Sequence, residues 1–268
     1  MQTLRHILST ALIVFVALSL LLFFFQRKMI YYPDRSPPNS VLAQSLGFES
    51  IQLETEDRLR LLAWYKKAQP NYPTIIMFHG NAGHIGYRLP LARQWADAGL
   101  GILMVEYRGY GGNPGSPTEK GLYKDGKAAL SFLAQQNVPP QDIVLFGASL
   151  GTGVAMELAS QHNFCSLILQ TPFLSLTAVA RYHYPWILIP PADRYDSLSK
   201  IKTVNTPLLV LHGKRDNIVP FSQGKALFEA SPAENKKFAQ FPDGNHNNLW
   251  CETFYQATLQ FILQNCRK

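Results

Sequence analysis

A serine between two glycines gives the first chemical signal in this sequence. The segment Gly147-Ala148-Ser149-Leu150-Gly151 follows the apolar run Ile143–Phe146 and leads into a stretch of helical character. Glycines at this spacing let the backbone turn sharply between a strand and a helix, so that the serine hydroxyl projects from the turn. We therefore predict that Ser149 is a nucleophile. The alternative is a glycine-rich turn in which the serine caps a helix.

Two later segments supply a base and a partner for that base. A serine hydroxyl is a weak nucleophile until a base takes its proton. Asp216 follows the apolar run Leu208–Leu211, and His246 follows the last predicted strand. His246 is expected to accept the Ser149 proton and pass it to the leaving group, while Asp216 fixes the imidazole tautomer. Asp243 is the rival carboxylate, but it lies only three residues before His246 in the same turn.

The segment His79-Gly80-Asn81 follows the first fully apolar strand and is a candidate for stabilising negative charge. Acyl transfer places that charge on a substrate oxygen, where fixed N–H groups can bind it. We expect the backbone N–H groups of Asn81 and Leu150 to form such an oxyanion hole, and His79 to hold the loop in place. The sequence has no cluster of metal ligands and no phosphate-binding loop, so no metal or organic cofactor is expected.

The elements that must position these groups alternate from residue 47 onward. Strands are predicted at 48–54, 59–65, 74–78, 101–107, 142–146, 166–169, 207–211 and 237–241, and helices near 86–98, 118–136, 150–162, 221–230 and 249–264. Short, continuous apolar runs are typical of parallel strands buried on both faces, whereas 48–54 and 59–65 alternate as an antiparallel pair would. We predict an α/β fold with a mostly parallel sheet of about eight strands and helices on both faces. The candidate residues would then meet beyond the carboxyl ends of the strands.

The sequence resembles the α/β-hydrolase superfamily in five segments. They are His79-Gly80-Asn81, Tyr107-Arg108-Gly109-Tyr110-Gly111, Gly147–Gly151 and the segments around Asp216 and His246. The resemblance covers most of residues 29–264 and implies serine-hydrolase chemistry. It is greatest to a membrane-anchored branch, which includes bacterial hydrolases with a Tyr-Tyr-Pro juxtamembrane motif and α/β-hydrolase-domain protein depalmitoylases, with serine aminopeptidase-like hydrolases as relatives. Asn245 stands where relatives often carry a small residue or Glu, which is not expected to affect the base.

The N-terminal region predicts a membrane anchor. Residues 7–25 carry no charge, and as a helix they would extend about 28 Å, close to the thickness of a bilayer core. A cleaved signal peptide is disfavoured because Phe23–Phe25 run directly into Gln26-Arg27-Lys28 without small residues. We predict a tail at 1–6, a transmembrane anchor at 7–25, a juxtamembrane linker at 26–46 that spaces the domain from the membrane, and a hydrolase domain at 47–268.

Flanking charge and overall composition bear on the location of the protein. Arg27 and Lys28 slightly outweigh Arg5 and the terminal amine, which favours a cytoplasmic catalytic domain, at the inner membrane if the protein is bacterial. The chain has a formal net charge of +7, with 47% hydrophobic and 16% charged residues. No run of Lys and Arg follows one face of an element, so a nucleic-acid interface is not expected.

The three cysteines of the chain predict no disulfide. Cys165, Cys251 and Cys266 lie at no metal-ligand spacing, and three thiols cannot all pair with one another. We interpret all three as free thiols, which suggests a reducing compartment.

Residues 173–200 interrupt the alternation of strands and helices and form a lid-like insertion. The insertion is rich in large apolar residues, namely Phe173, Leu174, Leu176, Val179, Tyr182, Tyr184, Trp186, Ile187, Leu188 and Ile189. It is either a helix packed on the domain or an apolar wall beside the nucleophile. The second interpretation favours hydrolysis of an ester or thioester of a lipidic or acylated substrate. Amide or peptide hydrolysis by the same residues and a non-catalytic scaffold that binds a lipid or partner at the membrane are the alternatives. Oligomeric state is not predicted.

Overall fold

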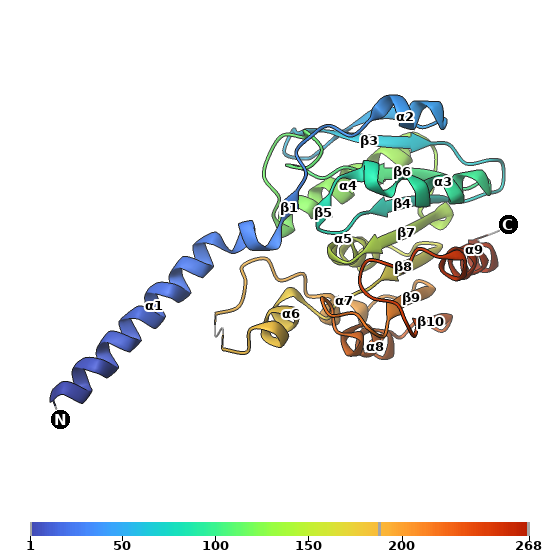
Figure 1. Ribbon diagram of the computed structural model, residues 1–268. Coiled ribbons are helices and arrows are strands. Elements are labelled where there is room, and N and C mark those ends of the chain that lie inside the picture. The colour runs from blue at the N-terminus through green and yellow to red at the C-terminus, as the bar shows by residue number, and fades with distance from the viewer. Residues whose placement is uncertain (1, 187–188, 267–268) are drawn as a thin grey trace.

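The computed structural model of the chain describes residues 2–186 and 189–266 (Figure 1). A central sheet has the order β10-β9-β8-β7-β4-β6-β3-β2, in which β3 is antiparallel to both of its neighbours and the other pairs are parallel. The strands are β2 Glu49–Glu54, β3 Arg60–Lys66, β4 Thr74–Phe78, β6 Gly101–Val105, β7 Ile143–Ala148, β8 Ser166–Gln170, β9 Leu208–Gly213 and β10 Lys236–Phe241. The predicted eight-stranded, mostly parallel sheet is confirmed.

Burial explains why the strand predictions succeeded. Every residue of β4, β6, β7, β8 and β9 is buried, as continuous apolar runs require. The two edge strands, β2 and β10, keep exposed residues between partly buried ones. Parallel strands covered on both faces read as apolar runs, and an edge strand keeps its polar side chains in water.

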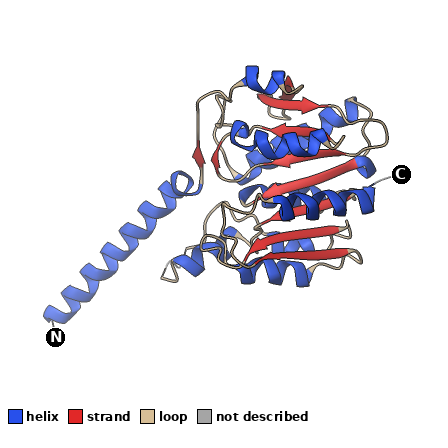
Figure 2. Ribbon diagram, turned by 45° about the vertical axis from the view of Figure 1, so that its right-hand side comes forward, coloured by secondary structure: helices blue, strands red, loops and turns tan. Residues whose placement is uncertain are grey.

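Helices cover both faces of the sheet (Figure 2). α3 Leu89–Asp97 and α9 Glu252–Cys266 pack into one apolar core, while α4 Glu119–Gln135, α5 Leu150–Ala159 and α8 Phe221–Ala230 pack into the other. Short 3-10 turns, η1 Ile85–Arg88 and η2 Pro140–Asp142, precede α3 and β7. α6 Leu176–His183 and α7 Ser197–Ile201 lie between β8 and β9, within the predicted insertion. Of that insertion, Ile187 and Leu188 lie outside the described residues.

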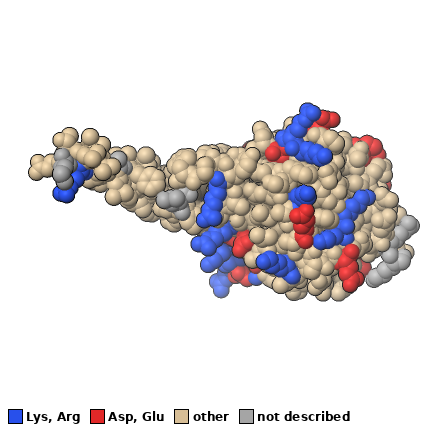
Figure 3. Space-filling view, turned by 90° about the horizontal axis from the view of Figure 1, so that it is seen from below, with Lys and Arg blue, Asp and Glu red and all other residues tan. Residues whose placement is uncertain are grey.

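The N-terminal helix α1, Gln2–Ile30, projects away from the sheet and its helices (Figure 1). It is apolar enough to cross a membrane, with a mean hydropathy of 2.8 over an 18-residue window of which none is buried in the protein. In Figure 3 the projecting helix carries few charged side chains, and basic side chains lie where it meets the domain. The last turn of α1 contains two basic residues, Arg27 and Lys28.

The segment after α1 docks on the domain, which differs from the predicted spacer. Tyr31 is only 4% exposed, and its hydroxyl lies 3.1 Å from a carboxylate oxygen of Asp193 and 3.0 Å from the hydroxyl of Tyr195. β1, Tyr32–Pro33, then pairs in parallel with β5, Ala82–Gly83, and α2, Ser40–Ser45, follows. The sequence-based prediction places Tyr31 in the juxtamembrane linker, outside the folded domain. A buried network of hydroxyl groups and a carboxylate, which the local sequence does not reveal, draws it into the protein instead.

The prediction of three free thiols is wrong. Cys165, before β8, forms a disulfide with Cys266 at the end of α9, and only Cys251 is a free cysteine. The two paired residues are 101 positions apart, so local spacing does not indicate that they meet. Packing of α9 on the sheet brings their Cα atoms within 5.3 Å, a separation typical of disulfides.

Candidate active site

Ser149 stands on a strained turn between β7 and α5. Its φ of 49° and ψ of −114° are unusual for a residue with a side chain, and its backbone N–H donates to the carbonyl of Gln170 at 2.9 Å. A Cβ atom on Gly147 would lie 2.5 Å from the carbonyl oxygen of Gly151, and one on Gly151 would overlap the carbonyl of Phe78. Both glycines are therefore required for the tight approach of β4, β7 and α5 beneath the serine.

The three residues predicted to act together lie in hydrogen-bonding succession. Nε2 of His246 is 2.9 Å from the hydroxyl oxygen of Ser149, and Nδ1 of His246 is 2.8 Å from a carboxylate oxygen of Asp216. A carboxylate only accepts hydrogen bonds, so Nδ1 carries the proton, and Nε2 is free to accept the proton of the serine hydroxyl. The loops after β7, β9 and β10 bring together residues that are up to 97 positions apart.

The carboxyl group of Asp216 is held ionised. Burial would raise its pKa, but hydrogen bonds from His212, His246 and the backbone N–H of Val219 outweigh burial and hold the pKa well below its ordinary value. One oxygen accepts from the backbone N–H groups of Ile218 and Val219 at 2.9 and 2.8 Å, which leaves the other to face the histidines. An anion fixed in this way can stabilise the imidazolium that forms when His246 takes a proton.

The two predicted oxyanion donors belong to segments close to Ser149. Leu150 is the first residue of α5, so its N–H belongs to the group of helix N-terminal donors that have no intrahelical acceptor. Gly80 brings the other loop close, since a Cβ atom built on it would lie 3.5 Å from Cβ of Ser149. Asn81 and Leu150 both line the same cavity as the serine.

Two residues that the sequence analysis missed hold Asn81. Its side-chain oxygen accepts hydrogen bonds from the backbone N–H of Tyr32 at 3.0 Å and from the hydroxyl of Tyr110 at 3.2 Å. Tyr110 belongs to the family-like segment that follows β6, a signal that could have indicated this role. Tyr32 belongs to the Tyr-Tyr-Pro motif, but that motif did not indicate this role, because Tyr32 reaches the loop only through the pairing of β1 with β5.

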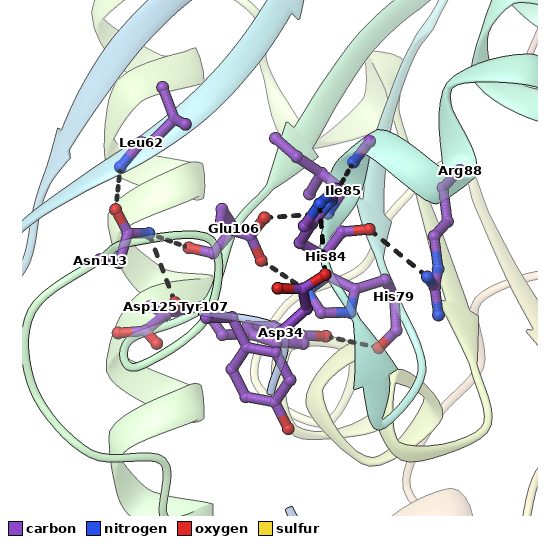
Figure 4. Close-up of polar contacts among 12 residues, drawn as sticks. Asp34, Leu62, His79, His84, Ile85, Arg88, Glu106, Tyr107, Asn113 and Asp125 are labelled. Carbon is purple, nitrogen blue, oxygen red and sulfur yellow. Dashed lines mark hydrogen bonds and ion pairs between the residues drawn. The ribbon is translucent and has the colours of Figure 1, made fainter. Parts of the chain in front are cut away.

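A buried polar pair, His79 and Glu106, lies beneath the same loop (Figure 4). Glu106 places one carboxylate oxygen 3.1 Å from Nε2 of His79 and accepts from the backbone N–H of Ile85 at 2.9 Å with the other. The hydroxyl of Tyr107 donates to the carbonyl of His79 at 3.0 Å. His79 and Glu106 are almost fully buried, so they support the loop from inside and do not contact substrate. A glutamate within the otherwise apolar predicted strand 101–107 was the available sequence signal for Glu106.

The candidate site opens into a groove of about 780 Å³. Its walls come from the Asn81 loop, the insertion between β8 and β9, and the last turns of α1. From the insertion, the described lining residues include Phe173, Leu176, Val179, Tyr184, Trp186 and Ile189. Leu174 and Tyr182, also predicted for this wall, are not among the lining residues. Among the described lining residues, Arg88 is the only Lys, Arg, Asp or Glu.

Comparisons with known proteins indicate the family of the chain. A family model described as serine aminopeptidase, S33 matches residues 69–190. A Mycobacterium tuberculosis protein is 37% identical over 251 residues, which cover 91% of this chain and 89% of that one. The Arabidopsis thaliana α/β-hydrolase domain-containing protein WAV2 is 32% identical, with coverages of 90% and 89%. A Saccharomyces cerevisiae protein named as a membrane protein is 31% identical, with 90% of each chain covered.

The fold also matches solved structures. The Pyrococcus furiosus esterase Pf2001 superimposes with a TM-score of 0.74 at 20% sequence identity, over 88% of this chain and 98% of that one. At this identity the match concerns the fold alone. The relatives above 30% identity span about nine-tenths of the chain, and the sheet has the expected order and direction. On these grounds, the chain belongs to the α/β-hydrolase superfamily.

Proposed function

We propose that this chain is a membrane-anchored serine hydrolase that cleaves carboxylic ester or thioester bonds of a lipidic or acylated substrate. The observation that carries the proposal is the succession of Ser149, His246 and Asp216, joined by contacts of 2.9 and 2.8 Å at the wall of a groove. Separations of this size are those at which a base can take a proton from a nucleophile.

The reaction follows from the geometry. His246 accepts the proton of Ser149 as the serine oxygen attacks the substrate carbonyl, and Asp216 stabilises the resulting imidazolium. The backbone N–H groups of Asn81 and Leu150 bind the negative charge on the carbonyl oxygen, and the N-terminus of α5 adds a favourable dipole. His246 then donates its proton to the leaving alcohol or thiol. A water molecule, activated by the same histidine, releases the acyl group from Ser149.

The groove supports an apolar acyl group as the substrate moiety. Its described lining is rich in aliphatic and aromatic side chains from the 173–200 insertion, which we propose acts as a lid. The esterase with the same fold is consistent with ester chemistry. A groove of about 780 Å³ lies within the size range of small-molecule sites.

Aminopeptidase activity is the second candidate, because the matching family model bears that description. An aminopeptidase must recognise a free ammonium group, for which a carboxylate in the site is the natural partner. The described groove lining contains no Asp or Glu, and its charged member is the cation Arg88. The electrostatics of the groove therefore favour an ester or thioester over a peptide with a free amino terminus.

We further propose that residues 7–25 span a membrane and that residues 47–268 form the catalytic domain. The hydropathy and exposure of α1 support this, as does the yeast relative named a membrane protein. Residues 26–46 dock the anchor on the domain. The flanking charges favour a cytoplasmic domain by a small margin, but a disulfide is typical of oxidising compartments. Because the charge margin is so small, we place the catalytic domain on the oxidising side, in contrast to the sequence-based expectation.

A fluorophosphonate probe tests the proposed chemistry. Full-length protein in detergent or vesicles should be labelled at Ser149, and Ser149→Ala should not be. Hydrolysis of p-nitrophenyl esters of increasing chain length, compared with aminoacyl anilides, then separates esterase from aminopeptidase. Preferential hydrolysis of the anilides would overturn the ester assignment. Folded protein that neither reacts with the probe nor hydrolyses either series would indicate a non-catalytic scaffold.

A further inference from the structure

The groove that contains Ser149 is also lined by the N-terminal helix. The lining residues from α1 are Ser19, Leu22, Phe23, Gln26, Met29 and Ile30. They recur at the spacing of one helix face, so a continuous stripe of α1 faces the groove. The same cavity thus touches both the candidate nucleophile and a helix that is otherwise unburied in the protein.

Neighbouring phenylalanines show which side of the helix faces the groove. Phe23 lines it and is 39% exposed, whereas Phe24 is not among the lining residues and is 76% exposed. Successive helical residues point about 100° apart, so Phe24 faces away from the groove. The exposed side would meet lipid, and the Phe23 side meets the groove.

Specific contacts fix the end of α1 beside the insertion. The guanidinium of Arg27 lies 3.1 Å from the carboxylate of Asp193, and the side-chain oxygen of Gln26 accepts from the backbone N–H of Ala192 at 2.7 Å. Asp193 also accepts from the buried hydroxyl of Tyr31. The helix is therefore a fixed wall of the groove.

We propose that the groove is an acyl-chain site that opens into the bilayer along α1, so that the enzyme binds a lipid ester whose chain remains in the membrane. This inference rests on the proposed hydrolase function and names its substrate class. With the hydrocarbon region ending near Phe25, Ser19 lies about 9 Å deeper along the helix, within the adjoining leaflet. An acyl chain can then pass from the leaflet along Ser19, Leu22 and Phe23 into the groove without crossing water.

The mouth of the groove fits the same direction of entry. Exposed apolar side chains from several segments surround it: Met29, Tyr32, Tyr184, Trp186, Ile189, Ile218 and Trp250. Aromatic residues with one polar end are typical of the boundary between lipid and water. Exposed apolar surface at a groove mouth is unfavourable in water but favourable against a membrane. The mouth therefore faces the bilayer that holds α1.

Two adjacent substitutions test the proposal in full-length enzyme reconstituted in phosphatidylcholine vesicles. Hydrolysis of a long-chain ester in the same bilayer is measured against hydrolysis of the water-soluble p-nitrophenyl acetate. Phe23→Ala should lower the ratio of long-chain to acetate activity by about tenfold, the size expected when a bound chain loses contact with a phenyl ring. Phe24→Ala, the matched control on the lipid-facing side, should leave the ratio unchanged. Fluorophosphonate labelling counts active sites in each preparation.

The outcomes separate this inference from the proposed function. Equal ratios for Phe23→Ala, Phe24→Ala and unmodified enzyme would overturn the acyl-chain site, while acetate hydrolysis would leave the hydrolase proposal intact. A second measurement presents the long-chain ester in vesicles separate from those holding the enzyme. Hydrolysis only within the shared bilayer is expected, and equal rates in both arrangements would refute entry from the membrane. Loss of both activities and of labelling in unmodified protein would instead contradict the hydrolase function.

Discussion

Asp216 and Asp243 are rivals in the sequence, and their surroundings separate them. Asp216 is buried and accepts from Nδ1 of His246. The side chain of Asp243 is 83% exposed and forms an ion pair with Arg215 at 2.7 Å, on the surface. An exposed ion pair contributes little to stability, and its carboxylate faces water. Substitution of each of the two aspartates, Asp216 and Asp243, therefore offers a matched test of which acid orients the base.

Asp216→Asn should lower kcat/KM for a p-nitrophenyl ester by about a thousandfold or more. The amide cannot stabilise the imidazolium and allows the wrong histidine tautomer. Asp243→Asn, the control, should stay within about twofold of the unmodified enzyme. Steady-state kinetics with active sites counted by titration would measure both. If the two variants lost activity equally, the assignment of Asp216 would be refuted.

Activity should depend on pH through the base and not through Asp216. A protonated imidazole cannot accept the serine proton, so kcat/KM is expected to fall on acidification. The pKa of the Asp216 carboxyl is held low by its hydrogen bonds, so this group stays ionised in weak acid. A pH profile of kcat/KM should show one acidic limb, and a rate that is constant down to pH 4 would contradict the role of His246.

The same lowered pKa affects stability in stronger acid. In the unfolded chain Asp216 takes up a proton near the ordinary aspartate pKa of about 3.9. In the folded chain it takes up that proton only at lower pH. The stabilising contribution of Asp216 is therefore complete above that value and is lost as the pH falls further, because the unfolded chain takes up the proton first.

At the level of elements, the short strand β1 connects the N-terminal helix α1 to the candidate oxyanion loop. Tyr32 pairs with Ala82 across β1 and β5, and its N–H donates to the side chain of Asn81. The segment that follows α1 thus holds the loop whose backbone N–H would bind the developing charge. This explains how the N-terminal region can be part of the candidate site.

Tyr32→Pro should reduce kcat by about tenfold or more, with a smaller effect on KM. Proline has no N–H, so the hydrogen bond to Asn81 is lost and the loop is less firmly placed in the transition state. Tyr32→Ala keeps the N–H and removes the ring, so it controls for the side chain. The kinetic parameters kcat and KM, measured separately for both variants, test the effect. If proline and alanine gave the same kcat, the role of this N–H would be refuted.

For the whole molecule, the disulfide is the feature with the widest consequences. It joins α9, at the end of the described chain, to the start of β8 in the central sheet. Cross-links of this kind commonly contribute about 2–4 kcal/mol to the free energy of unfolding. The disulfide also bears on where the catalytic domain lies, since such bonds are rare in reducing compartments.

Protein purified under non-reducing conditions with thiols blocked should carry one alkylated cysteine, Cys251, and three after reduction. Cys165→Ser with Cys266→Ser should lower the free energy of unfolding by about 2–4 kcal/mol, measured in denaturant. Cys251→Ser, the exposed control, should have no such effect. A C-terminal alkaline phosphatase fusion reports orientation and should be active. Three alkylated thiols without reduction, or an inactive fusion, would contradict an oxidising location.

The fold was predictable because strands that are buried on both faces of the sheet consist of continuous apolar residues. The apolar runs at β4, β7 and β9 predicted those strands to within about two residues, α4 was predicted to within one residue at each end, and α8 has its predicted bounds. The candidate residues were predictable because each follows a strand, and parallel strands end at one edge of the sheet. Short elements such as β1, β5 and α2 escaped notice because two to six residues carry too little periodicity to be recognised.

The sequence alone determined the order of the candidate residues along the chain: a serine between glycines, then an aspartate, then a histidine, each after a predicted strand. Only the tertiary structure decided that Tyr31 is buried, that Tyr32 holds Asn81, that Cys165 meets Cys266, and that α1 forms a wall of the groove. The physical reason is the separation along the chain over which each kind of interaction acts. Periodicity and turn chemistry act between neighbours along the chain, whereas these contacts join segments that are about 50 to 166 positions apart and form only when the whole sheet has packed.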